Sequence, residues 1–274
     1  MTDRVAFAAG LRPPWFLGMV HLRPLPGSPR CAENLDAILQ AAAADLDALV
    51  EGGADGAIIE NFGDVPFYPD RVPPVTIAAM TAIVAPLCAR APDGFLLGIN
   101  VLRNDAAAAL AIASAVKASF IRVNVHTGAV IADQGLIIGA AHETLRLRRS
   151  LGCPVAILAD VGVKHASPVG GRPVEDEARD AWERGLADCI LLTGPRTGTP
   201  VDIDQLRSVR RAIPEAPLLA ASGIDPERAR ELAPHCNGFV VGSWLKREGR
   251  ISERVDIARV RQLSAARQRV RGSV

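Results

Sequence analysis

Eight short runs of apolar residues recur along this chain of 274 residues, and each is followed by a loop and a segment with helical character. The runs are continuous rather than alternating, as expected of parallel strands that are buried on both faces. Strands that alternate with helices predict βαβ units and a parallel sheet. The predicted strands cover residues 16–20, 54–59, 95–99, 119–123, 154–158, 188–192, 217–221 and 238–241.

The segments between these runs carry the signals of helices. From Leu35 to Val50 the apolar residues repeat with helical spacing, and the pair Gly52-Gly53 ends the segment. Asp225 precedes Pro226, which is the usual order of an N-cap and a proline in the first turn. The other predicted helices cover 75–90, an Ala-rich stretch capped by Asn104 or Asp105, a stretch with Ile137, Ala141 and Leu145 on one face, 175–184, 202–212, and a tail with Ile257, Val260 and Leu263.

Eight strand–helix pairs without a linker or a break in composition predict one α/β domain over residues 1–274. The predicted fold is a single (β/α)8 barrel with an N-terminal extension (1–14) and a C-terminal helix (255–274). Strand order then follows chain order, so residues 16–20 pair with 238–242. A doubly wound open sheet is the alternative, and it would leave these two segments unpaired with each other.

Polar side chains follow the predicted strands where a barrel places its active site, at the carboxyl ends. The stretch 159–168 is the richest, because Asp160, Lys164 and His165 follow an apolar run within six residues. Three ionisable groups at this point are not expected in a hydrophobic core. They are expected at the rim of an active site or in a solvated turn. Together with Glu60 they are the predicted catalytic residues. The predicted substrate-binding residues are His21, Asn61, Asn100, Arg103, Asn124 and Thr193, although the asparagines could equally tie down loops.

Small residues follow the last two strands and predict a phosphate site. The pairs Ser222-Gly223 and Gly242-Ser243 let backbone approach a ligand, and residues 243–246 could form a short helix whose free N–H groups face the same point. Tight turns that need glycine are the alternative. The predicted phosphate-binding residues are Gly194, Ser222, Gly223, Gly242 and Ser243.

Two chemistries fit the predicted catalytic residues. Glu60, Asp160 and His165 could hold a divalent metal ion. Alternatively, Asp160 acts as a base, Lys164 as an electrophile or acid, and His165 as a proton shuttle. The sequence has no HxH, HExxH or DxD pattern that would favour a metal. It also has no GxGxxG after a strand, no Walker-type loop and no GxSxG elbow, so no motif indicates a dinucleotide, P-loop or serine-hydrolase site.

Composition and charge indicate in which compartment the protein works and which class of ligand it binds. The net charge of +1 gives no overall nucleic-acid footprint, and no apolar run is long enough to span a bilayer. The first residues lack a signal-peptide pattern, and the five cysteines form no CxxC pair. We therefore expect a cytoplasmic protein with reduced thiols, which binds a phosphorylated small molecule rather than nucleic acid and forms a homo-oligomer.

Several strings along the chain resemble the BtpA/SgcQ family. The resemblance runs from about Trp15 to Leu263, and the His-Leu-x-Pro-Leu-Pro-Gly and Val-Lys-His-Ala strings are its more specific parts. A polar residue is common in the family where this chain has Gly162, which implies that one site contact is absent here. The strings that carry the resemblance are residues 18–29, 60–64, 100–105 and 160–168, together with Ser222-Gly223.

The resemblance implies a fold similar to the ribulose-phosphate-binding barrels. The family takes its name from a role in photosystem I accumulation in cyanobacteria, and one relative is encoded among sugar-uptake functions and labelled a nucleoside triphosphatase. Two function classes follow. The first is an enzyme that isomerises, cleaves or hydrolyses a phosphorylated sugar or nucleotide-like metabolite. The second is a non-catalytic assembly factor for a membrane complex, which should present an exposed apolar patch.

Overall fold

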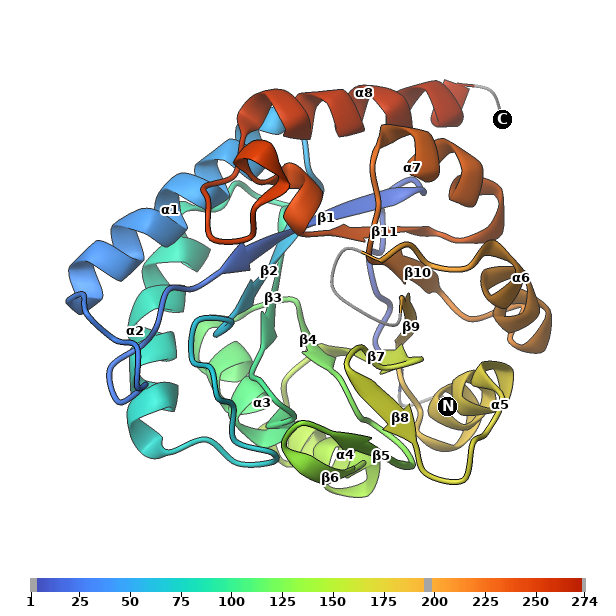
Figure 1. The fold of residues 1–274 in the computed structure, drawn as a ribbon, viewed down its shortest axis with the longest axis horizontal. Coiled ribbons are helices and arrows are strands. Elements are labelled where there is room, and N and C mark those ends of the chain that lie inside the picture. The colour runs from blue at the N-terminus through green and yellow to red at the C-terminus, as the bar shows by residue number, and fades with distance from the viewer. Residues whose placement is uncertain (1–3, 195–198, 273–274) are drawn as a thin grey trace.

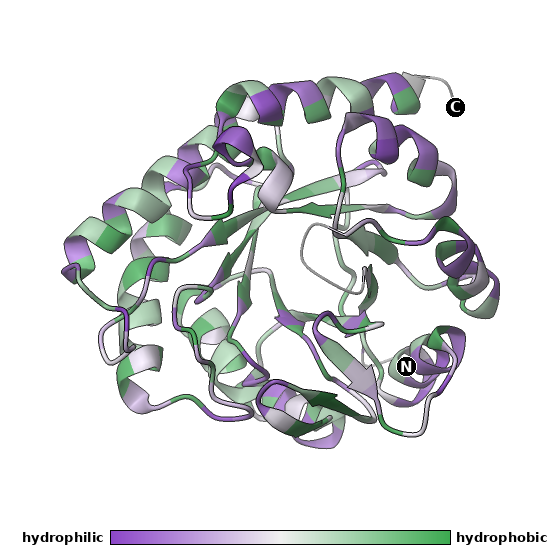
Figure 2. Cartoon of the chain, viewed as in Figure 1, coloured by the Kyte–Doolittle hydropathy of each residue, from purple (hydrophilic) through white to green (hydrophobic). Residues whose placement is uncertain are grey.

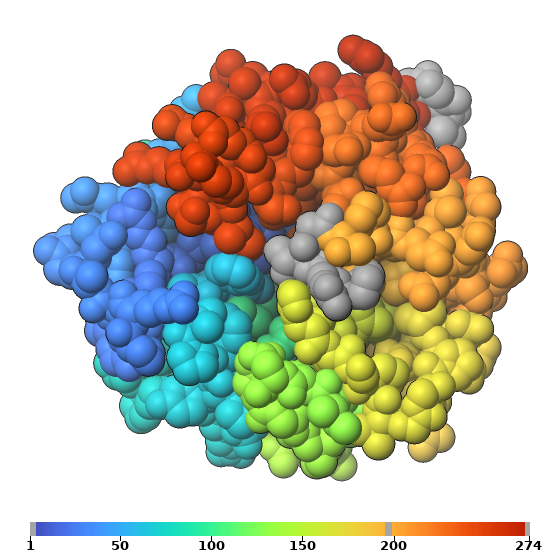
Figure 3. All heavy atoms as spheres, viewed as in Figure 1, coloured from blue at the N-terminus to red at the C-terminus, as the bar shows by residue number. Residues whose placement is uncertain are grey.

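Eight parallel strands close into a barrel with helices around it, as the computed structural model shows (Figure 1). The structure describes residues 4–194 and 199–272. The colours of the space-filling view follow one another around the molecule, as expected when strand order follows chain order (Figure 3). In barrel order the strands are β1 (Trp15–His21), β2 (Gly56–Glu60), β3 (Leu96–Asn100), β4 (Phe120–Val123), β7 (Ala156–Val161), β9 (Cys189–Thr193), β10 (Leu218–Ala221) and β11 (Gly238–Val241).

The barrel closes between its first and last strands. β1 pairs in parallel with β11, from Trp15 opposite Gly238 to Gly18 opposite Val241. On its other side β1 pairs with β2. The predicted closed barrel is therefore confirmed, and the open-sheet alternative is wrong.

The helices lie on the outside of the barrel, where Figure 2 shows most of the hydrophilic residues. Their ends follow the predicted capping signals, since Asp225 accepts from the amides of Glu227 and Arg228. The helices are α1 (Leu35–Gly52), α2 (Pro74–Arg90), α3 (Ala106–Val116), α4 (Ala141–Leu151), α5 (Val174–Arg179) with a π-helical turn (Asp180–Arg184), α6 (Ile203–Ala212), α7 (Pro226–Leu232) and α8 (Ile257–Gly272), with 3-10 turns at Ala233–His235, Ser243–Leu245 and Arg247–Gly249.

Each barrel strand contributes to two separate cores. In β7, Ala156 and Leu158 face the barrel interior, while Ile157 and Ala159 pack against the helices. The same alternation holds in β4, where Phe120 points inward and Ile121 outward. A strand buried on both faces explains why its sequence is apolar throughout.

The N-terminal extension fills the end of the barrel at which the strands begin. The Phe7 ring packs edge-on against Trp15 and Phe120, with ring centroids 5.4 Å apart in both pairs. The amide of Val5 donates to Asp188 at 2.6 Å, which fixes the extension to the start of β9. The extension is thus part of the inner core rather than an appendage.

One predicted helix was placed wrongly. Ile137 lies in β6 (Gly135–Ile138), which pairs with β5 (Ala129–Ala132), and the helix begins only at Ala141. Gly135 has a φ of +95° beside the hairpin turn, and Gly139 packs against the backbone of His126, so the helical spacing is interrupted twice. A third short strand, β8 (Ala166–Pro168), completes a small antiparallel sheet in the order β6-β5-β8.

Replacing Phe7 by alanine should destabilise the protein by about 3 kcal/mol, because it empties the space beneath the inner core. The free energy of unfolding, measured by urea denaturation, checks this value. Tyr68→Ala is the control, since its side chain is 54% exposed and its removal should change stability by less than about 0.5 kcal/mol. Equal effects of the two substitutions would contradict the role of the extension.

Candidate active site

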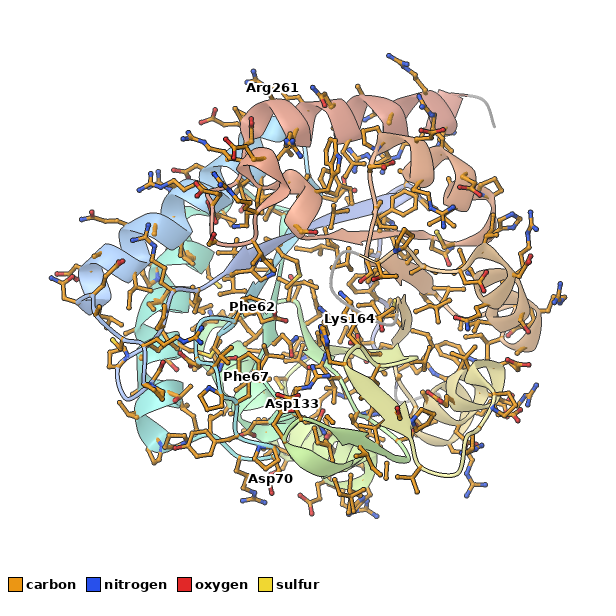
Figure 4. The ribbon with its side chains drawn as sticks, in the orientation of Figure 1. Phe62, Phe67, Asp70, Asp133, Lys164 and Arg261 are labelled. Atoms are coloured by element: carbon orange, nitrogen blue, oxygen red, sulfur yellow. The ribbon has the colours of Figure 1, made fainter. Side chains whose placement is uncertain are left out.

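A cavity of about 360 Å³ opens at the carboxyl ends of the barrel strands. Lys164, Phe62 and Phe67, which line it, lie near the middle of the barrel view, whereas Asp70 and Arg261 lie at the periphery (Figure 4). The sequence-predicted residues in the lining are His21, Glu60, Arg103, Asn124, Asp160, Lys164, His165, Ser222, Gly223, Gly242 and Ser243.

The inward alternation of the strands carries these side chains to the cavity. In β7 the side chains of Ala156 and Leu158 face inward, and Asp160 is the next inward-facing residue, which lines the cavity. Glu60 follows the inward Ile58 of β2 in the same way. The floor of the cavity is therefore a ring of polar side chains one layer above the apolar interior.

A buried arginine that the sequence analysis missed holds this floor together. Nε and one terminal nitrogen of Arg122 donate to the two oxygens of Asp160 at 2.9 and 2.8 Å. The other terminal nitrogen lies 3.8 Å from Oε2 of Glu60. Asn124 adds a third bond to Asp160, at 2.8 Å. One guanidinium thus balances two carboxylates out of water, in the paired geometry that buried charges require.

Glu60 differs from Asp160 in being less completely paired. Its Oε2 accepts from Asn100 at 2.5 Å, and its Oε1 lies 4.0 Å from Nε2 of His21. Burial raises the pKa of the Glu60 carboxyl, and the charge of Arg122 only partly opposes this. The raised pKa makes Glu60 a better proton acceptor than an exposed glutamate, which suits it to acid–base chemistry.

His21 belongs to the polar floor of the cavity and carries a neutral imidazole. Its imidazole packs on Phe62 with ring centroids 4.8 Å apart. Burial lowers the pKa of His21 well below its usual value, and the charges of Lys246 and Lys164 add to this. The neutral ring can donate one hydrogen bond and accept another, which suits a sugar hydroxyl.

Lys164 reaches the cavity from the loop after β7. The carbonyl of Lys164 accepts from Arg103 at 2.5 Å, which fixes the backbone at this point. Burial and then the charge of Arg122 lower the pKa of the Lys164 ammonium to about 8, against the attraction of Asp160 and Glu60. This amine is therefore uncharged at neutral pH far more often than the amine of an exposed lysine.

The opposite wall carries the two turns that were predicted to bind phosphate. Ser222 has a φ of +114°, an unfavourable conformation for a residue with a side chain, and Gly223 follows with a φ of +58°. Ser243 begins the 3-10 turn Ser243–Leu245. This segment is held in place by the buried ammonium of Lys246, which donates to Asp45 of α1 at 2.5 Å.

Some buried polar atoms at this cavity have no hydrogen-bond partner in the described residues. The lining contributes three of them, Nδ1 of His21, Oδ1 of Asn124 and Oγ of Ser222. Such atoms are costly to leave unpaired. Their position indicates a cavity shaped for a polar ligand.

Four predicted residues lie outside this lining. Asn61 bonds Asp64 and the amide of Leu102, and Asn100 orients Glu60. Thr193 donates to the carbonyl of Gly162 at 2.6 Å, while the amide of Gly194 donates to Ala221. Their hydrogen bonds are thus used inside the protein, and residues 195–198 of the same loop lie outside the described residues.

The sequence analysis missed Arg122, Asp133, Phe62 and Phe67, all of which line the cavity. The sequence could have identified Arg122, because it is a charged residue in an otherwise apolar strand, two positions before Asn124. Asp133 lies in the turn between β5 and β6, and this hairpin was not predicted because Ile137 of β6 was assigned to a helix.

The metal alternative does not match the geometry. Glu60, Asp160 and His165 line one cavity, but residues 4–194 and 199–272 contain no group of three or more His, Cys, Asp or Glu side chains placed to hold a metal ion. The reason is that Arg122 occupies both oxygens of Asp160 and lies beside Glu60. The acid–base alternative is compatible with this arrangement.

Lys164→Met should stabilise the protein at pH 7 by roughly 1 to 3 kcal/mol. The lowered pKa means that the unfolded chain binds more protons than the folded one between pH 8 and 10.5. Lys164 therefore costs stability below pH 8, and the cost disappears as the pH rises through this window. Urea denaturation at several pH values measures the difference between the variant and the native protein, which should shrink above pH 8. The exposed Lys117→Met is the control, and an equal gain there would contradict the argument.

Comparison with known proteins identifies the relatives of this chain. The family model described as "BtpA family" matches residues 14–269. The chain is 50% identical over 246 residues to the photosystem I biogenesis protein BtpA of Synechocystis, covering 89% of this chain and 84% of the relative. It is 44% identical over 259 residues to an uncharacterized protein of Thermococcus kodakarensis, covering 94% and 96%.

Solved structures share the fold at low sequence identity. The structure of native KDPGal superposes with a TM-score of 0.56 at 16% identity, covering 94% of both chains. Phosphoribosyl anthranilate isomerase from Thermococcus kodakaraensis gives 0.54 at 17% identity, covering 92% of this chain and 98% of that one. With a family model that spans most of its length and a relative at 50% identity, the chain belongs to the BtpA family.

Proposed function

We propose that this protein is an enzyme that binds a phosphorylated sugar in the barrel mouth and acts on it by acid–base chemistry. One observation carries the proposal. The ionisable residues Glu60, Asp160 and Lys164 line the same cavity as the turns at Ser222-Gly223 and Gly242-Ser243. Reacting groups on one wall and a small-residue anion site on the other fit a short ligand with a phosphate at one end.

The phosphate end of the ligand would lie between the loops after β10 and β11. The first amides of the turn Ser243–Leu245 have no acceptor within that turn, and such amides bind anions. The unpartnered hydroxyl of Ser222 is a further donor at the same wall. The phosphoribosyl anthranilate isomerases share this fold, and their name refers to a substrate with a phosphorylated ribose.

The sugar end would face the polar ring. Glu60 carries out proton transfer in this proposal, because its pKa is raised and Arg122 does not bond it directly. Asp160 orients Arg122, and the pair stabilises negative charge that develops on a substrate oxygen. His21 and Asn124, each with an unpartnered polar atom, bind hydroxyl groups.

Ser243→Asp should weaken binding of ribose 5-phosphate by roughly 1 to 3 kcal/mol, since it replaces an anion-binding turn by a like charge. Titration calorimetry with ribose 5-phosphate and with ribose measures the effect. Affinity for ribose should change much less. Ser150→Asp introduces the same charge at the exposed end of α4 and serves as the control. If Ser243→Asp binds ribose 5-phosphate as well as the native protein, the phosphate site is wrong.

A second candidate function, protein assembly, rests on the outer face of the small sheet. Four apolar side chains lie there side by side and largely exposed: Ile131 (59%), Leu136 (57%), Ile138 (64%) and Val169 (49%). A patch of this kind indicates a protein contact. It would suit an assembly factor, as the name of the Synechocystis relative suggests, but also a second copy of the chain. No helix in residues 4–194 or 199–272 is long and apolar enough to cross a membrane.

We expect the patch to join two copies, because β6 is an edge strand that can pair with itself about a two-fold axis. Light scattering should then report a dimer, and the double variant Leu136→Ser, Ile138→Ser should be a monomer. Leu151→Ser, also exposed but on α4, should remain a dimer. A monomeric native protein would contradict self-association and favour the assembly function.

A further inference from the structure

The chain contains only three lysines beside 28 arginines, and their environments differ sharply. Lys117 is exposed at the end of α3. Lys246 is buried and paired with Asp45. Lys164 lines the cavity, and its ammonium has no hydrogen bond or ion pair with any described residue. Nearly every positively charged side chain of this protein is an arginine, yet a lysine stands at the cavity wall.

Arginine cannot replace lysine in one kind of chemistry. A guanidinium stays protonated at any pH that a protein tolerates, whereas an amine that loses its proton is a nucleophile. The protein favours that loss at Lys164 in two ways, by removing the amine from water and by placing it near the cations Arg122 and Arg103. The carboxylates Asp160 and Glu60 only partly offset these effects, since Asp160 is already paired with Arg122.

We infer that Lys164 is a nucleophile that forms a Schiff base with the carbonyl carbon of a phosphorylated ketose or aldose in this cavity. The inference rests on the proposed function and deepens it. A protonated imine withdraws electrons from the adjacent carbon, which assists isomerisation or aldol-type cleavage. Simple hydrolysis of a phosphate would have no use for it.

Glu60 supplies the proton transfers that the step requires. The lone pair of Nζ attacks the carbonyl carbon, and the π pair moves to oxygen, which takes the proton of the Glu60 carboxyl. The nitrogen then returns one proton to Glu60. The new hydroxyl takes that proton and leaves as water while the nitrogen lone pair forms the C=N bond. The products are a protonated imine, one water molecule and the Glu60 carboxylate. The raised pKa of Glu60 keeps the starting carboxyl protonated more often than that of an exposed glutamate.

Trapping with pyridoxal 5′-phosphate, an aldehyde that carries a phosphate, tests the inference. The full-length protein is incubated with this probe, reduced with borohydride and digested, and mass spectrometry locates the modified lysine. We expect modification at Lys164 at least tenfold faster than at Lys117 or Lys246. The rate should rise with pH and reach half its maximum near pH 8, the pKa of Lys164, rather than near 10.5.

Two variants serve as controls. Lys164→Arg keeps the cation and should abolish the fast labelling, whereas Lys117→Arg should label like the native protein. Thermal melts establish that both are folded. Equal labelling of all three lysines, no labelling of Lys164, or unchanged labelling of Lys164→Arg would each overturn the inference.

The same assay separates this inference from the phosphate site. Pyridoxal, which lacks the phosphate, forms an internal hemiacetal and reacts more slowly with any amine. The phosphate advantage is therefore the ratio of the pyridoxal 5′-phosphate rate to the pyridoxal rate at Lys164, divided by the same ratio at the exposed Lys117. This advantage should exceed one in the native protein, and Ser243→Asp should remove it. If Lys164 is labelled rapidly but the advantage is absent from both proteins, the nucleophile stands and the phosphate site fails. If the advantage depends on Ser243 but another lysine is modified, the phosphate site stands and the nucleophile fails.

Discussion

Closure of β1 onto β11 is the constraint on which the rest of this structure depends. Once the parallel sheet closes, every strand has one face against the interior and the other against a helix, so both must be apolar. Closure also brings the carboxyl ends of all eight strands to a single mouth. The N-terminal extension completes the arrangement, because Phe7 fills the opposite end, where a closed barrel would otherwise expose its inner core.

Above that apolar interior, the protein places charges that it then has to balance without water. Arg122 does most of this by bonding Asp160 with two nitrogens and lying near Glu60 with the third. Arg122 neutralises the two carboxylates unequally, and this inequality is what suits the site to proton transfer. Asp160 is fully paired, whereas burial raises the pKa of Glu60 and lowers that of Lys164. Moving two pKa values toward neutrality is the arrangement that proton transfer requires, and it costs stability.

The family assignment fixes the fold and the likeness to other BtpA proteins, while the chemistry rests on this chain's own side chains. A ligand with a phosphate at one end and a carbonyl at the other would use both walls of the cavity. The small antiparallel sheet has a separate character. Its inner side chains Val130 and Ile137 pack against Val125 and Val163, which follow β4 and β7, while its outer face is apolar and exposed.

The sequence by itself determined the barrel and most of the polar residues that line the cavity. Continuous apolar runs of strand length, separated by capped helices, allow few folds other than a closed parallel barrel, and the residue after each run then falls at the mouth. Local pattern could not distinguish a side chain that faces the cavity from one that ties a loop. Asn61, Asn100, Thr193 and Gly194 were therefore predicted to bind a ligand, whereas the structure shows them bonded to other groups of the protein. The pairing of Arg122 with Asp160, the hairpin around Asp133 and the depressed pKa of Lys164 were decided only by tertiary structure. Each depends on groups far apart in the chain, whose distances and exposure to water are set when the barrel closes.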